Sequence, residues 1–145
     1  MKRQLFSVVV LLSFLMFGCG HDGPADLPRL YPCKIKIVDK SGDAVEDASV
    51  VAINSDSKWA SIGQTGSDGI AVLKTNGTYP GVPVGMYKIL VTKYSVTVTA
   101  KSSDPEQGDE VAETLVFDKS FSDESTTPLQ LTMEAKSNDV TFTVF

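Results

Sequence analysis

Residues 60–75 read ASIGQTGSDGIAVLKT and contain two strand-like segments joined by a tight turn. The two segments, Ala60–Thr65 and Gly69–Thr75, are short and carry β-branched residues. Between them, Asp68 and Gly69 tolerate the positive backbone φ that tight hairpin turns require. The stretch therefore predicts an antiparallel β-hairpin, and with it a fold built from short strands.

Strand signals precede this hairpin. Cys33, Ile35 and Ile37 alternate with lysines, which predicts a strand with one buried face. Cys33 is then expected to be a small buried hydrophobic residue, with a reactive or intermolecular thiol as the alternative. The apolar, β-branched segment Ala48–Asn54 predicts a central strand.

Strand signals also follow the hairpin. Met86–Lys93 alternates apolar and polar residues, and residues 94–100 are expected to prolong that strand. Near the C-terminus, residues 128–134 and 139–145 alternate in the same way. The sequence AKSND between them predicts a hairpin loop.

Residues 104–113 form an acidic segment that contains five Asp or Glu residues and no Lys or Arg. Pro105 and Gly108 predict a loop here. A solvated loop is the simplest interpretation, and a calcium site is the alternative because hard cations prefer several oxygen ligands.

The chain has 145 residues, enough for one domain. After the N-terminal region, no segment shows a sustained apolar period of 3.6 residues. About seven short strands with frequent turns predict an all-β fold, an antiparallel seven-stranded Greek-key β-sandwich over residues 33–145.

The N-terminus carries a different signal. Lys2 and Arg3 precede an apolar run over residues 5–17, which is typical of a secretory signal peptide and short for a membrane span. Gly18-Cys19 resembles the end of a bacterial lipobox, although Met16 and Phe17 depart from its usual residues. The resemblance implies that residues 1–18 are a lipoprotein signal peptide and that Cys19 carries a diacylglycerol anchor. The alternative is a plain secreted protein with a spare cysteine.

Residues 19–32, rich in proline and glycine, are then expected to be a flexible tether between lipid and domain. The expected location is the cell envelope, with the membrane as partner through the lipid anchor. In a Gram-negative cell, Gly20 after the lipid cysteine favours the outer membrane, because an Asp there is the inner-membrane retention signal. The net charge is -5, and no basic stripe is present, which argues against nucleic acid as a partner.

A set of turn and core positions recurs along the predicted domain at Gly42, Val45, Ala48, Val50, Thr65, Asp68, Gly69, Leu73, Gly85 and Tyr87. Through these positions, residues 33–145 resemble the carboxypeptidase regulatory-like, transthyretin-like β-sandwich family. The matching positions are turn glycines and core residues, and the ending also resembles that of small lipoproteins of planctomycete-type bacteria. The resemblance implies a fold rather than a chemistry. In such a sandwich the Tyr87 ring faces inward, and its hydroxyl is expected to reach a loop carbonyl at the edge.

Residues suited to catalysis are scarce. The single histidine, His21, precedes the predicted domain, so no His-dependent triad or multi-His metal site is expected in it. Transthyretin-like hydroxyisourate hydrolases need several histidines, and this activity is set aside. We therefore predict no catalytic residues, no metal and no cofactor, and a protein that is not an enzyme.

Two loop aromatics are candidates for ligand binding. Trp59 follows the polar stretch NSDSK, and Tyr79 lies between Thr78 and Pro80. An exposed aromatic ring can stack on a sugar. The simpler interpretation is that Trp59 covers one end of the core. The expected function is a non-catalytic interaction or structural module with an envelope protein or polysaccharide as partner. The alternatives are a carbohydrate-binding module and an accessory subunit of an envelope enzyme.

Overall fold

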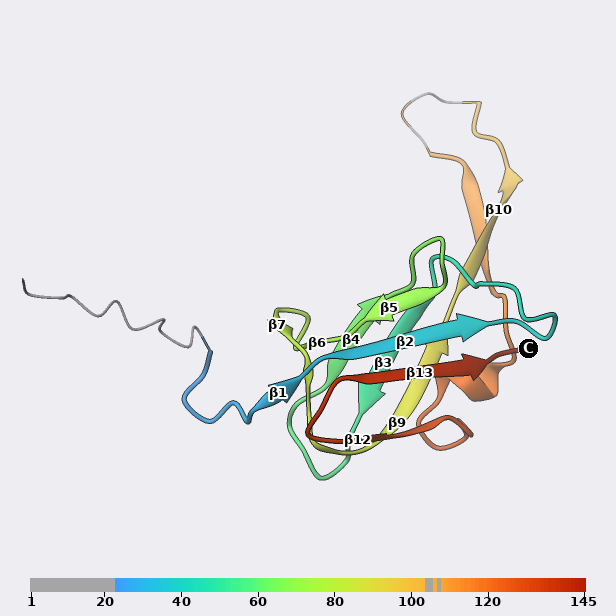
Figure 1. Cartoon of the computed structure of the whole chain (residues 1–145). Coiled ribbons are helices and arrows are strands. Elements are labelled where there is room, and N and C mark those ends of the chain that lie inside the picture. Colours follow the sequence, from blue (N-terminus) through green and yellow to red (C-terminus); the bar gives the residue numbers. More distant parts are fainter. Residues whose placement is uncertain (1–22, 104–105, 107) are drawn as a thin grey trace, which may run out of the picture.

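The computed structural model describes residues 23–103, 106 and 108–145, and its fold is all-β (Figure 1). The predicted signal peptide, Cys19 and His21 lie outside the described residues. Among the described residues, no helix is long and apolar enough to span a membrane. The elements are β1 (Leu30–Tyr31), β2 (Cys33–Val38), β3 (Ser49–Ile53), β4 (Ser61–Gln64), β5 (Ile70–Val72), β6 (Lys74–Thr75), β7 (Tyr79–Pro80), β8 (Val82–Pro83), β9 (Gly85–Thr92), β10 (Tyr94–Ala100), β11 (Glu110–Leu115), the 3-10 helix η1 (Lys119–Ser122), β12 (Gln130–Met133) and β13 (Asn138–Thr143).

One layer is a six-stranded sheet in the order β12-β9-β3-β4-β6-β7. β3 lies between β9 and β4, with Val50 opposite both Val91 and Gly63. The prediction of a central strand at Ala48–Asn54 is therefore confirmed. Val50 and Ala52 point into the core because alternate residues of a strand face opposite sides of the sheet.

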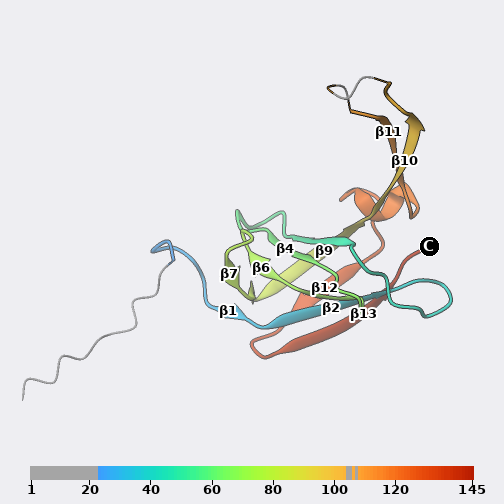
Figure 2. The same ribbon diagram turned by 90° about the horizontal axis from the view of Figure 1, so that it is seen from above.

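The second layer is a three-stranded sheet in the order β13-β2-β5 (Figure 2). β13 pairs with β2 in parallel, from Asn138 opposite Cys33 to Thr143 opposite Val38. The prediction of a wholly antiparallel fold is wrong at this pair. The two strands run in parallel because the chain crosses over between them through the rest of the domain.

The predicted C-terminal hairpin is also wrong. β12 pairs with β9 in one sheet and β13 pairs with β2 in the other, so the AKSND segment passes between layers. Asn138 holds this connection, because its side-chain amide donates to the carbonyls of Glu134 and Lys136 at 3.1 and 2.6 Å. Alternation in both segments predicted the strands correctly but could not show their partners.

The hairpin predicted at residues 60–75 is confirmed. Ser61 lies opposite Thr75, and Thr65 lies opposite Ala71. Its second half contributes to both sheets, because β5 pairs with β2 and β6 pairs with β4. This segment therefore joins the two sheets along one edge of the body.

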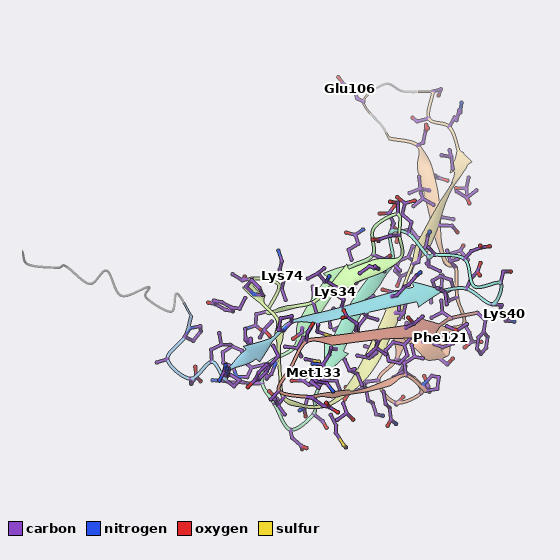
Figure 3. All side chains as sticks on the ribbon, viewed as in Figure 1. Lys34, Lys40, Lys74, Glu106, Phe121 and Met133 are labelled. Atoms are coloured by element: carbon purple, nitrogen blue, oxygen red, sulfur yellow. The ribbon has the colours of Figure 1, made fainter. Side chains whose placement is uncertain are left out.

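The core lies between these layers and reaches Phe121 of η1 and Met133 of β12 (Figure 3). Tyr87 is buried within it, as predicted, and its hydroxyl donates to the Pro83 carbonyl at 3.0 Å. The acceptor belongs to strand β8 rather than to the expected loop. The largest fully buried side chains are Tyr87, Phe121, Ile35, Ile37, Leu73, Ile89, Met133, Val50, Val82, Val91, Val144 and Thr75.

The domain begins earlier than residue 33. β1 pairs with β8, with Leu30 opposite Pro83 and Tyr31 opposite Val82. Gly81 permits this contact, since it has a φ of 103° and a Cβ there would lie 2.8 Å from the Tyr31 carbonyl oxygen. The prediction that the tether extends to residue 32 is thus wrong at its C-terminal end.

β10 and β11 form a separate antiparallel hairpin that projects from the body (Figures 1 and 2). We call residues 94–115 the arm. The predicted loop at residues 104–113 is too long, because Glu110–Glu113 belongs to β11. Cross-strand pairing with β10, including Val111 opposite Val98, overrides the acidic composition of that segment.

Candidate functional site

Chemically reactive groups do not converge in the described part of the chain. No group of three or more His, Cys, Asp or Glu residues suited to a metal ion occurs there. Cys33 is buried, and its burial, with a smaller effect of the Asp139 charge, raises the pKa of its thiol to about 11. A thiol that stays protonated at neutral pH is a poor nucleophile, which suits the predicted role of Cys33 as a packing residue.

Trp59 lies in the loop between β3 and β4. Its backbone N–H donates to the Ser57 hydroxyl at 3.1 Å, and the Lys58 ammonium lies 4.9 Å from its ring centroid. Lys58 also forms an ion pair with Asp26, which lowers the pKa of that carboxyl. The Trp59 side chain is partly exposed, and its loop is connected to the N-terminal segment through this ion pair.

Tyr79 lies on β7, opposite Thr75, and lines a pocket of about 530 Å³. One wall comes from the segment before β1 and the other from the β6–β7 turn. The lining residues are Gly23, Leu27, Arg29, Leu30, Thr78, Tyr79 and Pro80.

Trp59 and Tyr79 lie at the same end of the body but do not share a pocket wall. The Asn76 N–H donates to the Ala60 carbonyl at 2.8 Å, which connects the loop of Trp59 to the turn before Tyr79. Trp59 is not among the residues that line the Tyr79 pocket. The two aromatic rings thus belong to neighbouring surfaces of the end where β1 enters.

The arm presents an apolar face. Residues directly opposite in an antiparallel pair share one face of the ribbon, and the pairs Tyr94–Leu115, Val96–Glu113 and Val98–Val111 lie on one face. The opposite face is polar and small, with Ser95 opposite Thr114 and Thr97 opposite Ala112. The apolar side chains are well exposed: Tyr94 is 53% exposed, Val96 60%, Val98 50% and Val111 55%.

Acidic residues dominate the charge of the arm. It carries five acidic residues and one basic residue, Lys101. Glu113 lies on the apolar face itself, and Glu110 and Asp109 follow towards the tip, where Figure 3 places Glu106. Asp109 accepts a hydrogen bond from the Ser102 N–H at 2.9 Å and so ties the two sides of the ribbon together near the tip.

A groove of about 560 Å³ lies on the outer face of the six-stranded sheet, at the base of the arm. Exposed apolar side chains, Ile62 and Val72, form part of its floor. Lys74 and Lys93 also line it. The remaining lining residues are Asp47, Ser49, Gly63, Gln64, Gly77, Thr92 and Tyr94.

Sequence reasoning missed both the arm face and the groove. The signal for the arm was present, since Val96 and Val98 alternate with threonines, and Val111, Glu113 and Leu115 alternate on the other side of the acidic segment. Read as a hairpin, these two segments would have placed their apolar residues on one face. The groove has no comparable signal, because its lining comes from strands that are far apart in the sequence.

Comparisons with known proteins add no functional assignment. No protein-family profile and no curated protein sequence matches the chain. Among solved structures, the chain is similar to the crystal structure of a 9R-lipoxygenase from Cyanothece PCC8801, with 11% sequence identity and a TM-score of 0.40. The match covers 79% of this chain and 16% of the lipoxygenase chain, and a similarity this weak carries no argument about activity.

Proposed function

We propose that the chain is a lipid-anchored cell-envelope protein whose β-domain serves as a non-catalytic interaction module. The observation that carries this proposal is the exposed apolar face of the arm. Contiguous apolar surface on a soluble domain marks an interaction site, because leaving it in water costs free energy that a partner can recover.

The direction of the arm supports this arrangement. Residues 23–29 lead into β1 on one side of the body, and the arm projects on the other side (Figures 1 and 2). A lipid on Cys19 would hold the β1 end towards the membrane. The arm would then point away from the lipid surface, where a partner can reach it.

The resemblance to transthyretin-like sandwiches belongs to the same proposal. With the β5–β6 segment counted as one strand and the two-residue strands β1, β7 and β8 left out, the body has seven strands in two layers. We infer that they correspond to the seven strands of a Greek-key sandwich, with the arm as an insertion between the strands that β9 and β12 represent. That fold serves many functions, so the functional argument rests on the arm.

A site-specific crosslink tests the role of the arm. A photoreactive p-benzoylphenylalanine replaces Val98 in the full anchored chain, and the same substitution at Met86, which is 75% exposed at the far end of β9, provides the control. Irradiation of the native envelope is expected to yield a discrete protein adduct from position 98 and none from position 86. Equal yields at the two positions, or no adduct at position 98, would contradict the proposal. An envelope enzyme in the adduct would make the chain an accessory subunit.

The anchor has its own test. In Cys19→Ala the chain cannot be acylated at this position, so it is expected to leave the membrane fraction, as measured by sedimentation of lysed cells. Retention of Cys19→Ala in the membrane at the level of the unmodified sequence would contradict lipid anchoring through Cys19.

A second candidate function is carbohydrate binding at the β1 end. The observation that favours it is the Tyr79 pocket, with the partly exposed Trp59 on the adjoining surface. Trp59 is the single tryptophan, so a bound envelope polysaccharide is expected to change the intrinsic fluorescence. Unchanged fluorescence, together with unchanged polysaccharide retention in Tyr79→Ala, would rule out this function.

A further inference from the structure

The apolar face of the arm and the groove on the body meet at one residue. Tyr94 belongs to the arm face through its pairing with Leu115, and it also lines the groove. Along the strand, even-numbered residues from Met86 onward face outward, and Tyr94 continues that series. The molecule therefore carries one connected surface with two branches, the arm and the groove.

The two branches match in size. From Tyr94 to Val98 the arm extends about 13 Å, since a strand rises about 3.3 Å per residue. The groove spans three strand spacings, from β9 across β3 and β4 to β6, which is about 14 Å. Ile62 lies two of these spacings from β9 and in register with Leu90, four residues before Tyr94, so it is roughly 16 Å from Tyr94. This distance is close to the length of the arm from Tyr94 to Val98.

The two branches also match in charge. Acidic groups accumulate along the arm, with Glu113 on its face and Glu110 nearer the tip. Lys74 lies at the far side of the groove on the body, whereas the acidic tip is at the end of the arm (Figure 3). Lys93 adds a second positive charge to the groove, and Asp47 is its one acidic lining residue. The acidic branch is therefore complementary to the more basic one.

We propose that the partner of the arm is a second copy of this chain, with the arm of each molecule lying in the groove of the other. This inference rests on the proposed function of the arm. A two-fold axis through Tyr94 exchanges the two branches, so each copy supplies the same two surfaces and the contact is closed. Val98 and Val111 then cover Ile62 and Val72 of the second copy, and Glu113, on the same face of the arm, lies towards the Lys74 side of its groove.

Other occupants fit the arm less well. An anionic membrane surface would repel the acidic residues around its apolar face. The five apolar side chains of the arm alone are far fewer than the roughly 20–30 residues per side of a stable interface. In the reciprocal arrangement each copy contributes both its arm and its groove. The number of contacting residues per copy therefore approaches that of a stable interface.

Crosslinking between two tagged copies tests the arrangement. Full-length chains carrying Val98→Cys with one tag and Ile62→Cys with another are produced together and treated in native membranes with a short bis-maleimide. Cys33 is buried and does not compete for the reagent. A mixed-tag adduct is expected, because residue 98 of one copy lies over residue 62 of the other.

The matched control replaces Ile62→Cys by Met86→Cys, which is more exposed and lies on the same sheet. An equal adduct with Met86→Cys would show random collision and overturn the proposal. A different outcome is that Val98→Cys gives no mixed-tag adduct while the photoreactive group at position 98 captures another protein. That result would overturn the proposal of a second copy and leave the proposal of an interaction module in place. If position 98 captures nothing by either method, both proposals fail.

Charge reversal supplies an independent readout. Glu113→Lys in the arm copy is expected to lower the mixed-tag adduct about fivefold, the effect of an exposed charge pair worth about 1 kcal/mol. Lys74→Glu in the groove copy is then expected to restore the adduct. Failure of the second reversal to restore it would overturn the pairing of the arm with the Lys74 side of the groove.

Discussion

The segment from Gly85 to Ala100 alternates continuously, yet its first half packs into the core and its second half is exposed. In β9 every second residue is buried, with Ile89 fully enclosed and Val91 nearly so. In β10 every residue is exposed, although valines and threonines alternate there as regularly. Alternation therefore reports a strand with two unlike faces, and it does not report whether the apolar face is covered.

The difference arises from the neighbours of each half. β9 is flanked by β3 and β12, and the second sheet covers its inner face. β10 pairs with β11 alone within the described residues, and no layer lies over either face of the arm. An isolated two-stranded hairpin gains little from packing, so the arm depends on a partner for any further stabilisation.

Truncation of matched residues should give the largest contrast between the two halves. Ile89→Ala removes a fully buried side chain and is expected to lower the free energy of unfolding by about 2–5 kcal/mol. Val98→Ala, on the exposed half of the same segment, is expected to change it by less than about 0.5 kcal/mol in the monomer. Urea unfolding followed by circular dichroism measures both values. A large loss in Val98→Ala at low protein concentration would mean that the arm packs on its own body.

Backbone substitutions sharpen the contrast between an enclosed turn and an open one. Gly69 and Gly42 have φ values of 73° and 87°, so alanine is strained at both. A Cβ at Gly69 would lie 2.7 Å from the Ile37 carbonyl oxygen, whereas a Cβ at Gly42 meets nothing within 4 Å. We expect Gly69→Ala to cost about 2–3 kcal/mol and Gly42→Ala about 1 kcal/mol, the strain alone. Thermal unfolding compares the two, and equal losses would contradict the close approach of this turn to β2.

Titration of the buried Cys33 thiol should lower stability by less than Ile89→Ala or Gly69→Ala does. Burial raises the pKa of Cys33 to about 11 from an ordinary value of 9.0, so the folded state holds this proton more tightly than the unfolded state. The contribution of the protonated thiol to stability is fully present below pH 9.0. As the pH rises towards 11, the free energy of unfolding is expected to fall by roughly 1–2 kcal/mol. Cys33→Ala should remove that part of the decline and leave the part due to Tyr87, whose pKa burial also raises.

The same thiol contrasts the body with the arm in its reactivity. In the folded protein Cys33 is expected to resist maleimide, while Val98→Cys on the arm reacts rapidly at a protein concentration low enough to keep the chain monomeric, as mass spectrometry of the labelled chain would show. Rapid labelling of Cys33 at neutral pH without unfolding would contradict the burial of β2.

Prediction from sequence succeeded where a local signal had a local cause. The 60–75 hairpin, the strand at Cys33–Val38 and the central strand β3 were correct because turn residues and alternation act over a few neighbours. The hydroxyl of Tyr87 reaching a carbonyl was also correct, since a buried phenol requires a partner. The placement of Trp59 and Tyr79 at one end was left open, and the structure puts them on adjoining surfaces there.

The sequence by itself determined that this is an all-β chain with an N-terminal segment of a different kind, and it marked most strand positions. Only the tertiary structure decided which strands pair. β12 and β13 alternate alike, yet they belong to different sheets, and β10 alternates like β9, yet it lies outside the core. The physical reason is that side-chain alternation is encoded within one strand, whereas burial depends on what other segments, distant in sequence, bring against its apolar face.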